Sequence, residues 1–532
     1  EIARETRAVV WLTYGIHGDE SSSSQAALWT AWDLATGRAG LDGVLDSLIV
    51  VIDPVANPDG RDRYVNWYRS VRGEVPNPEV SSAEHRQPWP GGRYNHYLFD
   101  LNRDWTWASQ PETQARLAEF DRWHPAVHVD FHEMGHESSY FFFPAAAPIS
   151  PLYPESTARW AERFGRANAA EFDRRRWLYF TAEHFDLFYP GYGDSWPSLV
   201  GAIGMTYEQA GGGRAGLVVR RHDGELLKLA DRIERHRVAG ISTLRTAAAG
   251  KTDLLHDFAR FHSARDEAAP DFIVIPDQSG VVASQFSRSL VRQGIEVERA
   301  TGSFEASAEP HPGFVGRSDF PEGTLLVRAD QRRGRLARTL LQADVPHPTD
   351  GPGRTYDITA WSLPYAFGLE THSASRGVDG TEMAPVDTLA FDRAPNASGA
   401  ALPLGWLVAP SWQSSGPLVA WLRAGGRARA LEGEFELGGR KWPAGTRLLQ
   451  ADAEAAERLS SAGLAPFAVP VTTGWAEEGR DLGTSRSFGL RAPRIGVFRG
   501  SGTWATSFGS AWYFLERMAG VPFDALELEE IS

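Results

Sequence analysis

The sequence predicts an α/β fold, with a mainly parallel mixed sheet flanked by helices and followed by a second α/β and β-rich region. Strands are predicted at residues 9–14, 48–52, 126–131 and 202–207. The first is interpreted as a continuous apolar run, and the first two are typical of parallel strands buried on both faces. Segments with apolar residues at helical spacing separate them, and strands that alternate with helices favour a parallel sheet.

The first helix is predicted from about Gln25 to Ala35, after the text IHGDESSSS. Its small and apolar residues recur at helical spacing, so one face is expected to pack on the core. That face comprises Ala27, Leu28, Ala31, Leu34 and Ala35. Gly37 suits the left-handed position that ends a helix.

Two further helices are predicted in the same domain. Ser109 and Glu112 form a capping-box pattern around Pro111, where the first of them would begin. Its apolar residues are Leu117, Phe120 and Trp123. Residues 226–248 form the second, a long amphipathic helix that would close the domain. Between about 64 and 97 the chain is rich in proline, glycine and aromatic residues, and so long a loop is usually functional or disordered.

These elements predict four parts in the chain. Residues 1–250 form the first domain, and the chain is expected to begin inside it, because the text opens a few residues before a strand. Residues 251–269 are interpreted as a linker, and 270–490 as an accessory domain that is first α/β and then β-rich. Residues 491–532 spell strand, helix and strand, which indicates the start of a further α/β unit that is cut short.

Composition excludes several classes of protein. The chain has no cysteine, so disulfides and thiolate catalysis are excluded, and any metal must be held by histidine and carboxylate side chains. The formal net charge of −14 argues against a nucleic-acid partner, because phosphate binding needs a concentrated basic face. No run of about 18 apolar residues is present, so no membrane-spanning helix is expected.

His132, Glu133 and His136 spell H-E-x-x-H, which on a helix places two zinc-binding histidines on one face, with the glutamate as base. The surrounding text favours a strand, because AVHVDF precedes the motif and SSYFFFP follows it. Gly135 would also cost about 1 kcal/mol inside a helix. His132 and His136 would not share a face outside a helix, so we expect His132 alone to bind metal and His136 to be a polar surface residue.

A second set of candidate ligands lies at the carboxyl ends of the predicted strands. His17 and Glu20 follow the first strand, His132 follows the strand at 126–131, and Glu208 follows the strand at 202–207. In an open α/β sheet the ligand site forms outside the carboxyl ends of the strands. Zinc accepts imidazole nitrogen and carboxylate oxygen, and a catalytic site uses three protein ligands and a water molecule. The three segments are therefore expected to meet in a metal site.

The motifs GIHGDE, NPDG, DLNRDW, DFHEMG and GMTYEQ occur in this order, and together they resemble those of M14 zinc carboxypeptidases (funnelins) of a bacterial multidomain type. The resemblance covers roughly residues 9–250. It implies that one Zn2+ ion is bound by His17, Glu20 and His132, and that Glu208 is the general base.

The resemblance also implies roles for the text DLNRDW. Asp100 matches the acidic residue that orients a zinc histidine, here His17. Asn102 and Arg103 match the pair that binds the terminal carboxylate of the substrate, and a planar guanidinium suits that task. The plainer readings are that Asp100 is a turn residue and that Arg103 forms a surface salt bridge.

Two expected residues have more than one match. The arginine that polarises the scissile carbonyl is assigned to Arg69, with Arg63 and Arg72 as alternatives. The mobile tyrosine is assigned to Tyr192, with Tyr189 as the alternative. Three other residues are interpreted as packing residues of the core, namely Trp105, His128 and Tyr207.

The predicted protein is a zinc metallocarboxypeptidase, a hydrolase acting on peptides or peptide-like substrates that end in a free carboxylate. One alternative is a zinc amidohydrolase or deacylase that acts on N-acyl amino acids or murein peptides through the same site. The other is a binding protein with a degenerate site. The expected location is periplasmic or secreted.

Overall fold

The computed structural model describes residues 2–264, 269–277, 280–345, 361–375, 378, 382–386 and 403–527. The chain divides into two compact units. The first combines Glu1–Pro276 with Gln285–Val386, and the second combines Asp277–Ser284 with Asp387–Ser532.

This division differs from the predicted one at 250, 269 and 490. The first part of the predicted accessory region packs with the N-terminal region, so the two belong to one compact unit. The segment interpreted as a linker also contains a helix, α9 (Lys251–Ser263), which packs against α8 (Leu229–Ala249) and the first strand.

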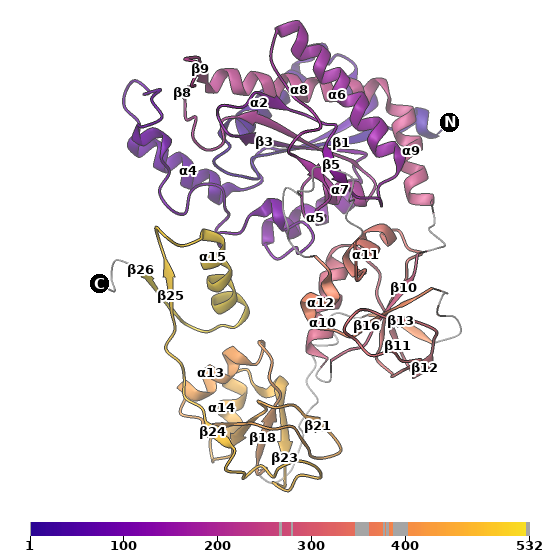
Figure 1. The fold of residues 1–532 in the computed structure, drawn as a ribbon, viewed down its shortest axis with the longest axis vertical. Coiled ribbons are helices and arrows are strands. Elements are labelled where there is room, and N and C mark those ends of the chain that lie inside the picture. The colour runs from indigo at the N-terminus through magenta and orange to yellow at the C-terminus, as the bar shows by residue number, and fades with distance from the viewer. Residues whose placement is uncertain are drawn as a thin grey trace. The chain divides into compact units, whose positions relative to one another are not determined.

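A five-stranded sheet forms the centre of the first unit, in the order β2-β1-β3-β7-β4 (Figure 1). Its strands are β1 (Ala8–Tyr14), β2 (Leu48–Asp53), β3 (Val127–Met134), β4 (Tyr140–Phe141) and β7 (Ile203–Ala210). β1, β2, β3 and β7 run parallel, whereas the short β4 pairs antiparallel with β7. The predicted α/β fold with a mainly parallel sheet is therefore confirmed.

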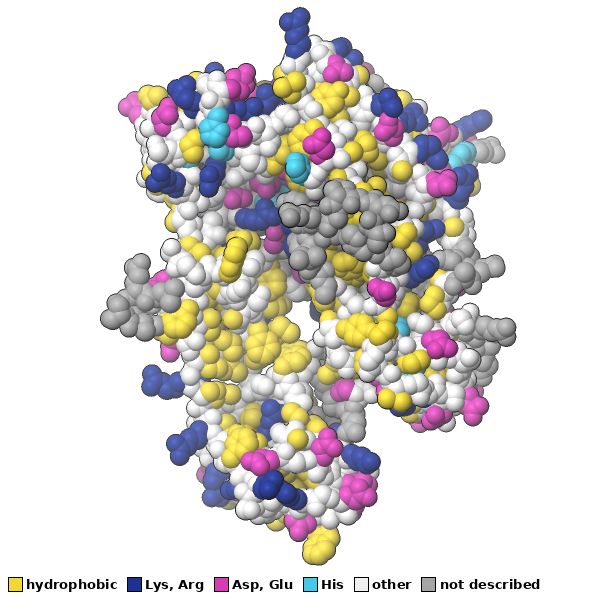
Figure 2. All heavy atoms as spheres, viewed as in Figure 1, with side chains coloured by type: hydrophobic (Ala, Val, Ile, Leu, Met, Phe, Trp, Pro, Cys, Tyr) yellow, Lys and Arg dark blue, Asp and Glu magenta, His cyan; other side chains and the backbone are white. Residues whose placement is uncertain are grey.

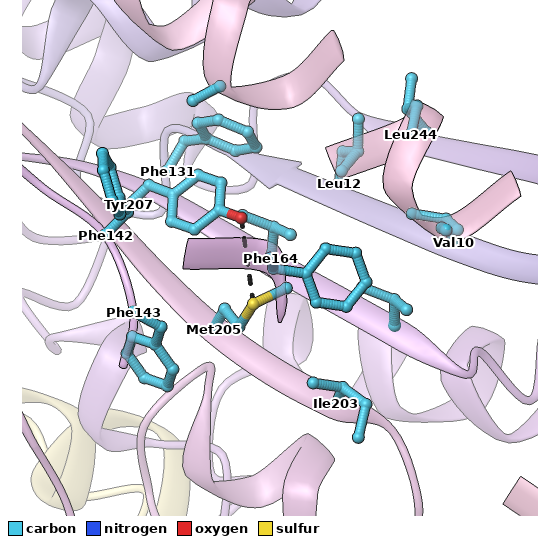
Figure 3. Packing of buried hydrophobic residues seen from close by; sticks show 14 of the residues in the cluster. Val10, Leu12, Phe131, Phe142, Phe143, Phe164, Ile203, Met205, Tyr207 and Leu244 are labelled. Carbon is cyan, nitrogen blue, oxygen red and sulfur yellow. Dashed lines mark hydrogen bonds between the residues drawn. The ribbon is translucent and has the colours of Figure 1, made fainter. Parts of the chain in front are cut away.

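The apolar runs form strands because both faces of the sheet are covered. On one face, α2 (Ser21–Thr36), α6 (Glu155–Arg175) and α8 cover a core that includes Leu12, Phe131 and Tyr207. Figure 3 shows how side chains from these strands and helices meet in this layer. On the opposite face, Trp11 stacks on Phe120 of α5 (Pro111–Trp123), with 5.7 Å between the ring centroids.

Helix α2 buries only part of the predicted face. Ala27 and Leu34 pack on the core, whereas Leu28 is 64% exposed and Ala31 and Ala35 are also exposed. The buried residues of the helix are Ser21, Ser22, Ser23, Ser24, Ala26, Ala27, Thr30 and Asp33. Polar groups are tolerated there because they have partners: Ser22 N donates to Glu133, and Asp33 accepts from Arg237 of α8. The prediction was wrong for Leu28, Ala31 and Ala35, because hydrophobic spacing cannot show that small polar side chains let two elements pack closely.

Two other helix starts differ from expectation. The capping box does not form: Gln110 is the N-cap residue of α5, and Ser109 Oγ donates to Asp104 instead. The predicted helix from 226 begins at Leu229, because β9 (Leu226–Lys228) pairs with β8 (Val218–Arg220).

The other elements of this region are α1 (Ile2–Glu5), α3 (Val44–Ser47), α4 (Pro58–Val71), η1 (Ala83–His85), η2 (Leu101–Arg103), β5 (Ala146–Ile149), β6 (Asp186–Leu187) and α7 (Ser195–Leu199).

A six-stranded sheet completes the first unit, in the order β13-β16-β10-β15-β11-β17. Its strands are β10 (Asp271–Val274), β11 (Glu298–Ala300), β13 (Glu309–Pro310), β15 (Leu325–Val327), β16 (Thr371–Ala374) and β17 (Met383–Pro385), and the hairpin of β12 (Phe304–Glu305) and β14 (Asp319–Phe320) accompanies it. The helices are α10 (Val281–Arg292), α11 (Gly334–Leu341) and α12 (Leu363–Phe367). β10, α10 and β11 follow one another along the chain, and β15 lies between the two strands and pairs antiparallel with both.

The second unit is β-rich, as predicted. Its main sheet has the order β23-β18-β22-β19-β24. The elements are β18 (Gly405–Val408), α13 (Ser415–Arg423), β19 (Ala428–Leu431), β20 (Phe435–Glu436), β21 (Lys441–Trp442), β22 (Arg447–Gln450), α14 (Ala455–Ser461), η4 (Ala465–Phe467), β23 (Ala468–Val471) and β24 (Ser487–Gly489). The strand, helix and strand predicted near the end are β25 (Gly496–Arg499), α15 (Ala505–Tyr513) with η5 (Phe514–Met518), and β26 (Asp524–Glu527), and the two strands are parallel.

The surface carries charges of both signs. On the face drawn in Figure 2, Lys and Arg side chains lie scattered among Asp and Glu side chains. Within the described part of the chain, no helix has both the length and the apolar character needed to cross a membrane. The periplasmic or secreted location stays a prediction.

Candidate metal centre and active site

Three metal-binding side chains meet at the carboxyl ends of β1 and β3. His17 follows β1, Glu20 stands at the start of α2, and His132 lies near the end of β3. His17 Nδ1 lies 3.2 Å from His132 Nδ1. The Glu20 carboxylate lies 2.7 Å from the His17 nitrogen and 3.0 Å from the His132 nitrogen. Among the described residues, these three buried side chains form the group that could hold a metal ion.

A carboxylate orients each imidazole ring. Asp100 Oδ1 lies 3.0 Å from His17 Nε2, and Asp130 Oδ2 lies 3.0 Å from His132 Nε2. Each ring therefore turns its other nitrogen toward the shared ligand position. Burial opposes ionisation of Asp100, but Arg93 and His17 hold the pKa of this carboxyl well below its usual range. Sequence reasoning missed Asp130, although it stands two residues before His132, on the same face of a strand.

Glu208 lies beside His132, because β7 and β3 pair with these two residues opposite each other. Its buried side chain lines the same cavity as His17 and Glu20. Burial raises the pKa of Glu208 to about 8, with His132 lowering it and Glu20 raising it. A cation bound beside Glu208 would lower this pKa toward the values at which a carboxylate can act as a general base.

Two members of this group, His17 and Glu20, line a cavity of about 210 Å³. Its other lining residues are Arg93, Asn102, Arg103, Glu133, Met134, Gly135, Phe185, Asp186, Tyr192, Asp194, Thr206 and Glu208. A larger cavity of about 640 Å³ lies in the second unit beside Trp412 and Trp442, but it contains none of the predicted site residues. The smaller cavity is therefore the candidate active site.

The predicted substrate-binding residues Asn102, Arg103 and Tyr192 come together in this cavity. The Arg103 guanidinium lies over the Tyr192 ring, 4.6 Å from its centroid. Asn102 Oδ1 accepts a hydrogen bond from Gly193 N at 2.7 Å, and Asn102 Nδ2 lies 3.2 Å from His132 Nε2. These contacts join the segment of Arg103 to the segment of Tyr192 beside the metal-binding group.

The structure does not bring Arg69 into the cavity. Arg69 and Arg72 are exposed at the end of α4. Arg93 lies beside the metal-binding group instead, with Nη1 3.2 Å from His17 Nδ1 and 3.5 Å from Glu20 Oε1. Arg93 was missed because the long loop contains several arginines, and their order along the chain does not show which one folds back toward the metal ligands.

The remaining alternatives lie outside the described lining of the cavity. Arg63 donates to the backbone carbonyls of Gly91, Tyr94 and Asn95, so it holds the long loop in place. The Tyr189 hydroxyl donates to the backbone carbonyl of the arginine in DLNRDW at 3.1 Å. Both contacts shape the segments that carry the cavity residues.

The predicted packing residues are confirmed as buried. Trp105, His128 and Tyr207 have no exposed surface. His128 Nε2 lies 2.9 Å from Thr13 Oγ1, and its ring contacts that of Trp105 at 5.5 Å between centroids. Burial lowers the pKa of His128 to about 4, so this histidine is neutral in the fold.

The H-E-x-x-H text lies in a strand, as predicted, because β3 includes both His132 and Glu133. Glu133 accepts from Arg232 Nη1 at 2.9 Å and from Ser22 N at 2.8 Å, so it belongs to a buried ion pair. His136 lies beyond the strand, part-buried, with Nε2 3.2 Å from Glu137 Oε1.

This arrangement of candidate ligands and a glutamate at three neighbouring strands can be compared with known protein families. Residues 2–176 match Peptidase_M14, the zinc carboxypeptidases. The predicted resemblance to the M14 family is confirmed over this segment. The M14 segment includes His17, Glu20 and His132, whereas Tyr192 and Glu208 lie beyond it. No curated protein matches the chain.

Solved metallo-carboxypeptidase structures are similar to part of the chain. The enzyme from Burkholderia cenocepacia is 17% identical, with 47% of this chain and 58% of that chain covered and a TM-score of 0.34. The enzyme from Pseudomonas aeruginosa, in complex with (2-guanidinoethylmercapto)succinic acid, is 15% identical, with 48% and 59% covered and a TM-score of 0.33. Carboxypeptidase A from Helicoverpa armigera is 18% identical, with 46% and 62% covered and a TM-score of 0.31. The chain thus spans less than two thirds of the length of each of these proteins.

Proposed function

We propose that the protein is a zinc metallocarboxypeptidase, which hydrolyses an amide bond next to a free carboxylate. The observation that carries this proposal is a cavity that His17, Glu20, Glu208 and Arg103 line together, with His132 in contact with the first two of these residues. Metal ligands, a carboxylate base and a cation for the substrate's carboxylate are the groups that this reaction requires.

The ligand group fits a zinc ion. Donor atoms about 2 Å from a tetrahedral zinc lie about 3.3 Å apart. His17 Nδ1 and His132 Nδ1 lie 3.2 Å apart, close to that spacing, and the two oxygens of Glu20 lie beside them, Oε1 2.7 Å from His17 Nδ1 and Oε2 3.0 Å from His132 Nδ1. Two imidazoles and one carboxylate, each imidazole held by a further carboxylate, form a donor set typical of catalytic zinc.

A zinc ion held there would polarise the scissile carbonyl and acidify a water molecule. Glu208 accepts the proton of that water and delivers it to the nitrogen of the leaving amine. Arg93, whose guanidinium faces the ligand group, stabilises the negative charge that develops on the carbonyl oxygen. Arg103 binds the substrate's terminal carboxylate, and Asn102 and Tyr192 complete the wall beside it.

The protein is expected to bind one zinc ion per chain and to hydrolyse peptides that end in a free carboxylate, but not the same peptides with a C-terminal amide. The amide form lacks the charge that Arg103 recognises. Metal analysis measures the zinc content, and assays of each peptide with a free carboxylate and with a C-terminal amide measure the selectivity. Removal of zinc by a chelator should abolish hydrolysis.

Each alternative has its own outcome in the same panel. Release of an acyl group from N-acyl amino acids, with peptides untouched, would favour the deacylase. A zinc-loaded protein that hydrolyses nothing would favour the binding protein and would contradict the proposal.

Replacement of Arg93 tests the assignment of the carbonyl-polarising group. Arg93→Ala is expected to lower kcat by about 10²- to 10³-fold, because a donor to the developing oxyanion is lost. Arg69→Ala, the matched control on the exposed end of α4, should stay within about twofold of the wild type, as surface substitutions usually do. Steady-state kinetics with equal zinc content measure both. The reverse pattern would restore Arg69 as the functional residue.

A further inference from the structure

The side chain of Gln293, which follows α10, is inserted between two segments of the N-terminal region. Gln293 Oε1 accepts a hydrogen bond from Trp196 Nε1 at 2.6 Å. Its Nε2 donates to the backbone carbonyls of Trp105 and Thr106, each at 2.9 Å. Gln293 is 2% exposed, so these bonds form away from solvent, where an unmade bond is costly.

The end of α10 fixes Gln293 in this place. Gly294 takes the left-handed conformation with φ +72°, and Ile295 N donates back to Leu290 O. This is the geometry that commonly ends a helix at glycine. Arg333, at the start of α11, lies over the Trp196 ring at 5.6 Å. Trp196 is therefore contacted from two elements, by Gln293 at the end of α10 and by Arg333 at the start of α11.

The two bridged segments are those that carry the cavity residues. Trp105 follows Arg103 by two residues, and Trp196 follows Tyr192 by four. Trp196 N donates to Tyr192 O, so a shift of the Trp196 ring moves the backbone that bears the tyrosine. The hydrogen bonds of Gln293 thus join the segment that carries Arg103 to the segment that carries Tyr192.

We propose that Gln293 is a positioning residue for the recognition of the substrate's carboxylate, and that residues 285–386 are in this way part of the active site's framework. The inference rests on the proposed function, because it assigns Arg103 and Tyr192 to substrate binding. Without the bridge, one of the contacts that hold these two segments together is lost, while the hydrogen bond from Gly193 N to Asn102 Oδ1 remains and the ligands His17 and His132 keep their own supports.

Gln293→Met tests this, since methionine keeps the length of the side chain but neither accepts the Trp196 hydrogen bond nor donates to the two carbonyls. KM for a free-carboxylate peptide should rise about tenfold or more, with kcat within about threefold and zinc content unchanged. Hydrogen exchange of backbone amides should become faster in residues 101–106 and 192–199 but not in 17–20.

Two further variants separate positioning from general packing. Trp196→Phe removes one partner of the bridge, so its effect on KM and that of Gln293→Met should not add in the double variant. Arg335→Met is the matched control, because Arg335 also joins residues 285–386 to the N-terminal region, through Leu152 O at 2.7 Å. It should leave KM unchanged.

The outcomes are distinct. Unchanged KM and unchanged exchange in Gln293→Met would overturn the inference, and so would faster exchange throughout the first unit with an unchanged KM. A wild-type protein that cleaves no free-carboxylate peptide contradicts the proposed function. In that case the exchange comparison still decides whether the bridge holds the two segments, and equal exchange in wild type and variant overturns it.

Discussion

Glu208→Gln should lower kcat for hydrolysis of a free-carboxylate peptide by about 10²- to 10⁴-fold, the range that a positioned general base contributes. Glutamine keeps the size of the side chain but cannot take up a proton. Zinc content should not change, because Glu208 is not one of the three residues of the ligand group. Single-turnover kinetics with a metal assay on the same sample measure both quantities.

The neighbouring Gln209→Ala is the control for disturbance of β7, since residue 209 follows Glu208 in the same strand. Loss of this buried side chain is expected to lower stability, yet the variant should keep a far larger fraction of kcat than Glu208→Gln. Full hydrolysis by Glu208→Gln would show that the assigned base is wrong.

Glu133→Gln should lower the free energy of unfolding of the first unit by about 3–5 kcal/mol, the usual cost of breaking a buried ion pair on one side. Both carboxylate oxygens of Glu133 accept from Arg232 Nη1 at 2.9 Å, and Arg232 has no exposed surface. The substitution leaves a buried guanidinium without its counter-charge. Denaturant unfolding followed by tryptophan fluorescence measures the change.

The double variant Glu133→Gln with Arg232→Met should recover much of the loss, because it removes the unpaired charge as well. Glu137→Gln is the matched control, since Glu137 lies near the surface and its loss should change stability by about 0.5 kcal/mol or less. If Glu133→Gln instead keeps full stability and abolishes hydrolysis, Glu133 acts as the base and the buried pair is not structural.

The H-E-x-x-H motif gives the role of base to its own glutamate, which is Glu133 here, whereas we assign that role to Glu208. Glu133 N donates to Glu20 Oε2 at 2.9 Å, so the buried pair also supports a metal ligand from behind. Glu208 faces the cavity from the adjacent strand. We therefore expect Glu133 to serve stability and Glu208 to serve catalysis, because Glu133 is paired with Arg232 and Glu208 faces the cavity.

Much of the first unit follows from local sequence. The strand at residues 9–14 is predictable because VVWLTY is apolar at nearly every position, which is typical of a sheet covered on both faces. The face of α2 was not predictable in this way. Ser22 and Asp33 are buried because Glu133 and Arg237, more than 100 residues away, are their partners. Spacing along a helix contains no information about such partners.

Local patterns are enough to predict that His17, Glu20 and His132 meet, because residues at the carboxyl ends of parallel neighbouring strands lie at one edge of the sheet. The same patterns are enough to predict that the H-E-x-x-H text is not helical. The fold is needed to show which arginine lies beside this group: Arg93 folds back from a loop whose path depends on contacts such as those of Arg63. Likewise only the fold places Gln293 between Trp105 and Trp196, because that contact joins residues nearly 200 and nearly 100 positions apart, and its energy depends on geometry that no local pattern encodes.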